Sequence, residues 1–337
     1  MINQKLHVLA LFGALVLSAS GLSAKAHADT PHRAAWMQEA KWGVMIHYQA
    51  SWLANENDLE RITMEKWNDL IDNFDCEGLA KQLADVGAGY LIITVRHTRH
   101  FFMAPNATFD RYMGDAPSIC SNRDLIVDLS RALDRYDIPL IVYLPGQFSI
   151  APAERKAFAY DRDDPRLAEA YLRWQEVVRE FSIRWGDKVA GWWIDGTYRP
   201  NTTSRHPDIP NFASKAAAMR AGNPDSIVAF NPGVFPRVMS LTPHEDYTAG
   251  EITGPGNIRW MYNKDGIIDG AQIHILSYLG RTWGRGEPRF TSEEVIRHSK
   301  NINAVQGAIT WDVQAHPSGL IKEPFLEQLS LLGKALK

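Results

Sequence analysis

The sequence predicts one α/β domain built as a (β/α)8, TIM-like barrel. Short apolar runs alternate with amphipathic segments along the chain, which is the pattern of parallel strands connected by helices. Eight such runs are present, and eight strands close naturally into a barrel. Without its first 28 residues the chain keeps about 309, and a barrel of about 250 residues forms a single domain. We therefore expect one domain over residues 29–337, with no β-sandwich after it.

The expected strands are short and apolar, and most end in a polar residue. They span residues 42–48, 89–95, 139–145, 189–195, 226–232, 246–252, 273–279 and 307–313. Between them lie segments such as 76–87 and 123–137, in which apolar residues recur every three or four positions. This spacing predicts helices. The sixth unit is the weakest, because residues 254–270 are rich in Gly and Asn and show no clear helix.

The N-terminus has the pattern of a secretory signal. A single charge at Lys5 precedes an apolar run from Leu6 to Leu17, and small residues then lead to Ala28. This predicts a signal peptide over residues 1–28 and a periplasmic or secreted protein. The run is shorter than the roughly 20 apolar residues of a membrane span, so we expect no stable membrane insertion. Loss of Lys5 and Lys25 shifts the formal charge from -3 to about -5, which argues against a nucleic-acid partner.

Composition gives a weak indication of substrate and none of a cofactor. The chain has 11 tryptophans, and indole faces often stack on sugar rings, although most buried tryptophans only fill a core. Cys76 and Cys120 can pair in an oxidising compartment, but the sequence does not show whether they are within reach. There is no Gly-rich phosphate loop and no cysteine cluster of the metal-binding type, so we expect no cofactor.

In a barrel of this class the active site lies at the C-terminal ends of the strands. The polar residues expected there are His47, Arg96, His97, Tyr143, Asp195, Asn231, Glu251, Ser277 and Asp312. Asp195 ends the run GWWID and precedes Gly196, so its carboxylate should face the open end of the barrel. By the two-residue period of a strand, Trp193 shares its face. The alternative for Asp195 is a structural role as the cap of the following turn.

The histidines have two interpretations each. His47 is either a core histidine bonded to a backbone carbonyl or a residue that binds substrate hydroxyls. His97 and His100 have a spacing that is possible for a metal pair, but a third ligand at a convincing spacing is missing. We therefore expect hydrogen bonding to sugar hydroxyls and no metal.

Several segments together resemble the alpha-L-fucosidases, glycoside hydrolase family 29. The segment WGVMIHYQ is similar to the family's WFGIFIHWG, and GWWIDG matches the motif WfDg, which carries the family's nucleophile. EDYTAGEI resembles DYxTPE, and LGRTWGRG resembles a late SWGY turn. The regions that span residues 74–101 and 123–145 are also similar, in the same order along the chain.

The resemblance implies a retaining mechanism with Asp195 as the nucleophile, in which two carboxyl groups lie about 5 to 5.5 Å apart. His47 and His97 match positions that bind the fucose hydroxyls, and Trp42 lies beside the first of them in the sequence. The complete set of expected substrate-binding residues is His47, His97, Trp42, Trp193, Tyr143 and Arg96.

The resemblance does not identify the acid/base residue, because the chain departs from the family's pattern. The late WE motif aligns near Gln272 and Ile273, where no carboxylate exists, and Thr98 replaces a second consecutive histidine. We favour Glu251, which ends the sixth expected strand. The other carboxylates considered are Glu245 and Glu287, and the structural alternative is that Glu251 pairs with Arg259 while Asp312 holds the barrel shut.

The sequence thus predicts an exported glycosidase that acts on α-linked L-fucose, or on a sugar of similar hydroxyl pattern, in a glycan or polysaccharide. One alternative is a catalytically silent barrel that binds glycans, since the WE carboxylate is missing. Another is the same chemistry on a different sugar or on an internal bond of a fucose polymer.

Overall fold

The computed structural model describes residues 32–56, 62–97, 101–146, 151–257 and 265–337. The expected signal peptide, residues 1–28, lies outside the described residues. In the part of the chain that is described, no helix is long and apolar enough to cross a membrane.

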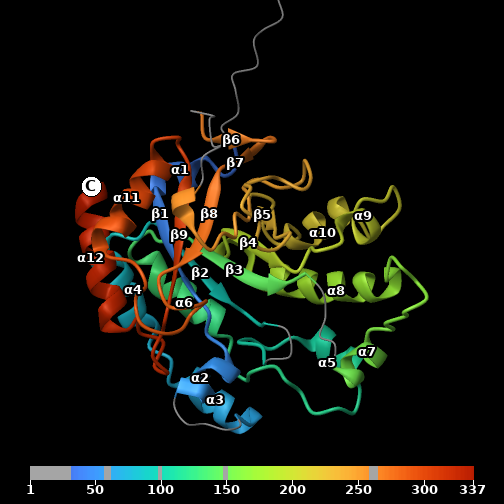
Figure 1. The fold of residues 1–337 in the computed structure, drawn as a ribbon. Coiled ribbons are helices and arrows are strands. Elements are labelled where there is room, and N and C mark those ends of the chain that lie inside the picture. The colour runs from blue at the N-terminus through green and yellow to red at the C-terminus, as the bar shows by residue number, and fades with distance from the viewer. Residues whose placement is uncertain (1–31, 57–61, 98–100, 147–150, 258–264) are drawn as a thin grey trace, which may run out of the picture. The chain divides into compact units, whose positions relative to one another are not determined.

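Seven parallel strands of the described chain form one curled sheet in the order β5-β4-β3-β2-β1-β9-β8 (Figure 1). These strands are β1 (Trp42–Ile46), β2 (Leu91–Thr94), β3 (Leu140–Pro145), β4 (Gly191–Asp195), β5 (Ile227–Phe230), β8 (His274–Tyr278) and β9 (Ala308–Val313). Each lies within an expected strand and ends at most three residues from its expected limits. The α/β, TIM-like barrel fold predicted from the sequence is therefore confirmed.

The sixth expected strand, residues 246–252, is not a regular strand, and this prediction is corrected. The segment Glu245–Ile252, which we call the closing segment, forms only isolated bridges, from Tyr247 and from Glu251. The reason is Gly250, whose φ of 62° interrupts the extended backbone. A Cβ at Gly250 would also overlap the carbonyl oxygen of His274.

The closing segment lies between β8 and β5 and completes the ring in two different ways. Toward β8 it forms backbone hydrogen bonds, such as those from Leu276 N–H to Gly250 O and from Ile252 N–H to Leu276 O, both 2.9 Å long. Toward β5 there is one backbone hydrogen bond, from Asp246 N–H to Val228 O at 2.9 Å, and two carboxylates accept the other bonds. Asp246 accepts the N–H of Val228 at 2.8 Å, and Glu245 accepts the N–H of Phe230 at 2.6 Å.

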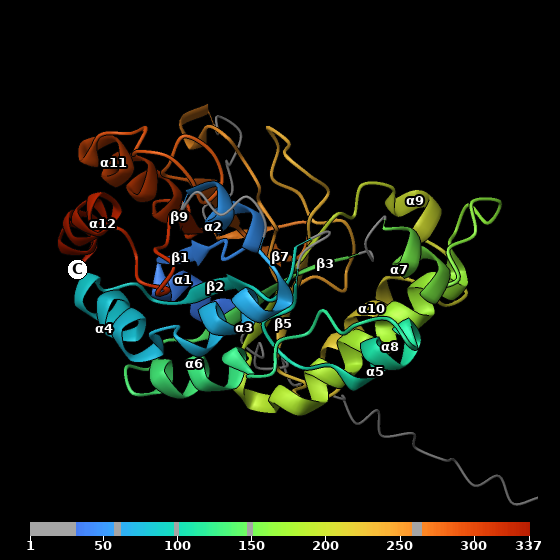
Figure 2. The same ribbon diagram turned by 90° about the horizontal axis from the view of Figure 1, so that it is seen from below.

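Helices cover the outer face of the sheet. Around it, α11 packs on α12, α12 on α4, and α4 on α6, while α8 packs on α10 (Figure 2). The helices of the described chain are α1 (Ala35–Ala40), α2 (Ala50–Glu56), α3 (Met64–Asp72), α4 (Cys76–Val86), α5 (Ala107–Met113), α6 (Leu125–Asp134), α7 (Pro152–Ala157), α8 (Ala168–Trp185), α9 (Pro200–Thr203), α10 (Phe212–Met219), α11 (Ser292–Asn303) and α12 (Glu323–Leu336). Side-chain caps fix several starts: Asp75 caps α4, Asp124 caps α6, and Thr291 forms a capping box with Glu294 at α11.

In the described residues of the weak sixth unit the elements are short. They are the 3-10 helix η2 (Pro255–Asn257) and an antiparallel pair of strands, β6 (Ile267–Ile268) and β7 (Ala271–Gln272). A second 3-10 helix, η1 (Gly186–Lys188), precedes β4. Cys76 and Cys120 are both buried, and both are free thiols in the structure, so they do not form a disulfide with each other.

The strands divide their side chains between two cores, as the two-residue period requires. One set points outward and packs with the helices, for example Val44, Ile46 and Val142. The other set fills the interior of the barrel, including Met45 and Ile92. The polar residues at the strand ends continue the inner set, so His47 follows Met45 and Asp195 follows Trp193 toward the open end of the barrel.

Candidate active site

Asp195 ends β4 at the C-terminal rim of the barrel and is held by several donors. Tyr143 donates its hydroxyl to Oδ2 at 2.6 Å, and Gly196 donates its backbone N–H to Oδ1 at 2.8 Å. Asn231 Nδ2 also donates to Oδ1, at 2.8 Å. Gly196 has a φ of 80°, a conformation that favours glycine, and this turn directs the chain away while the carboxylate stays at the rim.

Asn231 connects Asp195 to Glu251. Its Nδ2 also donates to Glu251 Oε2, at 2.5 Å, while its Oδ1 accepts the N–H of Gly233 at 3.0 Å. The backbone donor fixes which end of the amide carries the nitrogen. Because the two carboxylate oxygens lie 2.8 and 2.5 Å from one nitrogen, they are at most about 5.3 Å apart, the sum of those distances.

The surroundings of Glu251 favour the protonated form of its carboxyl group, as a proton donor requires. Burial is the largest cause that raises its pKa, to about 7, and the neighbouring charge of Asp195 also raises it, while the hydrogen bond from Asn231 lowers it. At neutral pH a substantial fraction of Glu251 is therefore uncharged and able to donate a proton.

A wall of rings faces this pair, formed by His47, Trp52, His97, Tyr143 and Trp283; we call it the aromatic wall. The ring of His47 has its centroid 4.9 Å from Trp52, 5.6 Å from Tyr143 and 6.0 Å from Trp283. His97 stacks on Tyr143 at 5.7 Å. Imidazoles beside indoles offer both hydrogen bonds and flat apolar faces, which suits a polyhydroxylated ring.

Asp312 orients His47. Its Oδ1 lies 2.7 Å from Nδ1 of His47, and its other oxygen accepts the backbone N–H of Gly284. Burial raises the pKa of Asp312, although the neighbouring His47 opposes this effect. The bond on Nδ1 leaves Nε2 of His47 as the ring nitrogen that can meet a ligand.

The structure brings together His47, His97, Tyr143, Asp195 and Glu251, but Trp193 lies one layer deeper. The indole of Trp193 is buried, stacks on Tyr143 with centroids 5.2 Å apart, and donates to Ala249 O at 3.0 Å. It therefore supports the tyrosine that binds Asp195.

Two expected substrate-binding residues lie elsewhere, and their assignment is corrected. Trp42 begins β1, at the opposite end from the site, and packs in the outer core. Arg96 turns away from the rim, donates to Glu154 at 2.7 Å and stacks on Phe102 with its Cζ 4.6 Å from the ring centroid. Both side chains are almost fully buried, so they stabilise the layer between sheet and helices.

The alternative acids are not beside Asp195. Glu245 is buried, and its carboxylate accepts from Phe230 N–H, Leu241 N–H and the hydroxyl of Ser240. Its bonds are those of a structural residue of the closing segment. Glu287 is exposed on the loop after β8. Arg259, the alternative partner of Glu251, lies outside the described residues.

Over the described ranges, the structure contains no group of three His, Cys, Asp or Glu side chains that is arranged to hold a metal ion. His100, the second member of the considered pair, and Thr98 fall outside these ranges.

Sequence reasoning missed three residues of the site and one role. Trp52 on α2, Trp283 after β8 and Tyr198 after β4 come from connecting segments, where the strand period does not apply. The resemblance of LGRTWGRG to the SWGY turn was the available signal for Trp283. Tyr198 places its hydroxyl 3.5 Å from Asp195 Oδ1. Asn231 was recognised as a strand-end residue, but its position between the two carboxylates was not.

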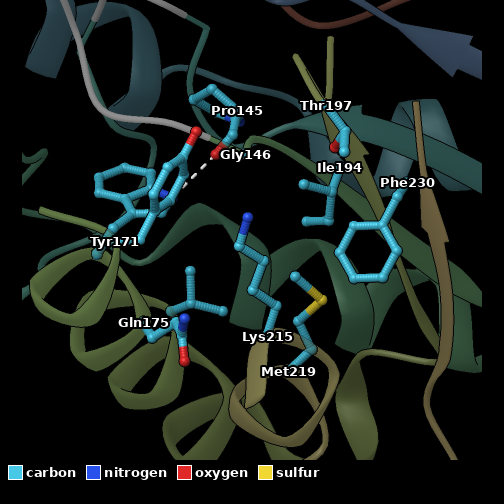
Figure 3. A pocket seen from close by; sticks show the side chains of 11 residues that line it. Pro145, Gly146, Tyr171, Gln175, Ile194, Thr197, Lys215, Met219 and Phe230 are labelled. Carbon is cyan, nitrogen blue, oxygen red and sulfur yellow. Dashed lines mark hydrogen bonds between the residues drawn. The ribbon is translucent and has the colours of Figure 1, made fainter. Parts of the chain in front are cut away.

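Behind β4 lies a small cavity. Its volume is ≈ 10 Å³, about one water molecule, and it lies beside Ile194, Thr197 and the amine of Lys215 (Figure 3). Lys215 donates to Ser204 Oγ at 2.8 Å and lies 4.0 Å from the centroid of the Tyr171 ring. Burial lowers its pKa to about 7. The cavity is on the outer side of the sheet, so it is not part of the site at the rim.

Comparisons with known proteins agree with this architecture. No family model and no curated protein matches the sequence. Among solved structures, an endo-fucoidan hydrolase of glycoside hydrolase family 107, MfFcnA4, is similar at a TM-score of 0.72 and 17% identity, over 90% of this chain and 53% of that one. The chain thus spans about half of that hydrolase. A second endo-fucoidan hydrolase of the same family, P5AFcnA, gives a TM-score of 0.67 and 16% identity, over 90% and 92%.

A third similar structure is the alpha-L-fucosidase AlfC from Lactobacillus casei in complex with alpha-L-fucose. Its TM-score is 0.61 and its identity 14%, over 90% of this chain and 97% of that one. At identities this low, the structural similarity establishes a shared barrel fold.

Proposed function

We propose that this protein hydrolyses α-linked L-fucosides, in glycans or in a fucose polymer, with retention of configuration. The observation that carries the proposal is the pair Asp195 and Glu251, joined by a single donor nitrogen of Asn231. The bound of about 5.3 Å on their oxygens agrees with the separation of about 5 to 5.5 Å of retaining glycosidases. Two of the structural neighbours are an endo-fucoidan hydrolase and an alpha-L-fucosidase in complex with its product alpha-L-fucose, which supports the choice of sugar.

In the first step Asp195 attacks the anomeric carbon as the bond to the leaving oxygen breaks, and that oxygen takes the proton of Glu251. In the second step the Glu251 carboxylate removes a proton from water, whose oxygen attacks the same carbon and displaces Asp195. Tyr143 and Asn231 orient the nucleophile, and His47 and His97 bind sugar hydroxyls from the aromatic wall. We also propose that the protein is exported by its N-terminal signal.

The test compares wild type with Asp195→Asn on an aryl α-L-fucoside and on fucoidan. We expect wild type to cleave at least one substrate and Asp195→Asn to lose turnover while it retains its circular dichroism spectrum. Asp195→Ala should recover part of its rate on the aryl fucoside with azide, which replaces the missing nucleophile. If wild type binds fucose oligosaccharides but cleaves none, the protein is instead a glycan-binding barrel.

A further inference from the structure

Three large, exposed side chains lie on two loops that are hydrogen-bonded to residues of the site. Tyr198, Val234 and Phe235, which we call the shelf, have exposed fractions of 58%, 48% and 44%. They lie on the loops after β4 and β5, the strands that lead to Asp195 and Asn231. Single exposed apolar residues are common on any protein, but several together at a site indicate a binding surface.

Hydrogen bonds and packing hold these loops together and hold them to the site. Thr197 donates its N–H to Asn231 O at 2.9 Å, and Phe235 donates its N–H to Glu251 O at 3.3 Å. The ring of Tyr198 lies against Gly233, where an added Cβ would be 3.2 Å from Cε1 of the ring. Gly233 has a φ of 105°, so glycine is required there for both reasons. The shelf is thus fixed relative to Glu251.

We propose that the shelf binds the first sugar ring of the leaving group. This inference rests on the proposed function, in which Glu251 protonates the leaving oxygen. A ring attached to that oxygen must extend from Glu251 outward, and the loop bonded to the Glu251 backbone carries Phe235 and Val234. The aromatic wall comes from β3, from the segments that follow β1 and β2, including α2, and from the loop after β8. It therefore serves the sugar that Asp195 attacks.

The chemistry of the shelf defines the group that it accepts. Its side chains are two aromatic rings and one branched aliphatic group, which carry no charge and present flat apolar surface. A pyranose ring has an apolar face of C–H groups that packs on such surface. We therefore assign to the shelf a sugar ring that binds through this face, with its polar substituents directed to solvent.

The experiment compares two substrates whose leaving groups differ in size. α-L-Fucosyl fluoride has a single atom as its leaving group, whereas fucoidan oligosaccharides have a sugar ring. For Phe235→Ala we expect kcat/KM on the oligosaccharides, divided by kcat/KM on the fluoride, to fall about 10-fold. Phe235→Tyr keeps the ring and should keep the wild-type ratio. Leu331→Ala is a second control. It removes an apolar side chain of α12 that is about as exposed, at 47%, and it should also keep the wild-type ratio.

A binding measurement makes the test independent of turnover. In an Asp195→Asn background, Phe235→Ala should weaken the binding of fucoidan oligosaccharides about 10-fold by titration calorimetry. An unchanged ratio and unchanged binding, with wild type active on both substrates, would overturn the shelf and leave the proposed function intact. A change of oligomeric state in Phe235→Ala with no change in the ratio would show that a second copy of the chain covers the shelf. Wild type inactive on both substrates would instead overturn the proposed function.

Discussion

Tyr143 donates its hydroxyl to Oδ2 of Asp195 at 2.6 Å, and its ring is stacked between Trp193 and His97. A phenol held on both faces has few conformations open to it, so the oxygen that it binds is held as well. Burial and the neighbouring charge of Asp195 raise the pKa of Tyr143 well above its ordinary value. The phenol therefore stays protonated and remains a donor over the whole working pH range.

Tyr143→Phe should lower kcat on an aryl α-L-fucoside about 10- to 100-fold, because hydrogen bonds to charged groups contribute roughly 1.5 to 3 kcal/mol. The phenyl ring preserves the stack on Trp193 and His97. Steady-state kinetics measure the loss, and an unchanged melting temperature shows that the fold is intact. A kcat near that of wild type would mean that the tyrosine does not position Asp195.

The pH dependence of kcat/KM should show a limb that belongs to Glu251. Its pKa is raised to about 7, mainly by burial, and its protonated form is the active one. The rate should therefore fall as pH rises through about 7 and approach a tenfold loss for each further pH unit. Glu251→Gln should remove this limb, and a variant that retains it would assign the limb to another group.

Glu251→Ala should distinguish substrates by their leaving groups. A poor leaving group needs a proton in the transition state, whereas an activated aryl group does not, so the loss should be much larger for the former. The comparison is made with a series of aryl α-L-fucosides of increasing phenol pKa. Equal losses along the series would exclude Glu251 as the acid.

Lys215→Met should stabilise the protein at pH 7 by on the order of 3 kcal/mol, because burial lowers the pKa of this lysine to about 7 from 10.5. The unfolded chain binds more protons between these two values, so wild-type stability should rise with pH from about 7 to 10.5. The variant should lack this rise in urea unfolding series. Lys334→Met, at an exposed position of α12, is the control and should change little. Destabilisation by Lys215→Met at pH 7 would show that the bond to Ser204 outweighs the cost of burial.

The fold was predictable because buried parallel strands are short apolar runs, and seven of the eight expected runs are strands of the sheet in the described chain. The remaining run, the sixth along the chain, is the closing segment, and it contains Asp246, Gly250 and Glu251. Its departure depends on the positive φ of Gly250 and on carboxylates that replace carbonyls, which are tertiary features. The order of residues along this run does not reveal either feature.

The site was predictable where the strand period applied. Asp195, Tyr143 and His47 each end a strand on its inner face, and the structure places them together. Trp42 lies five residues before His47, an odd separation that puts it on the opposite face, so the period itself identifies the misassignment. Trp52, Trp283 and Tyr198 depend on the paths of loops, for which the sequence offers no comparable rule.

The closing segment gives the barrel a joint that is weaker on one side than on the other. Glu251 belongs to this segment, whereas Asn231 follows β5, so the bridge between the two carboxylates crosses the joint. Regions with fewer backbone hydrogen bonds open at lower free energy than the rest of a fold. On heating, the two edges should therefore separate while the remaining ladder persists. The protein would then lose its activity before its secondary structure.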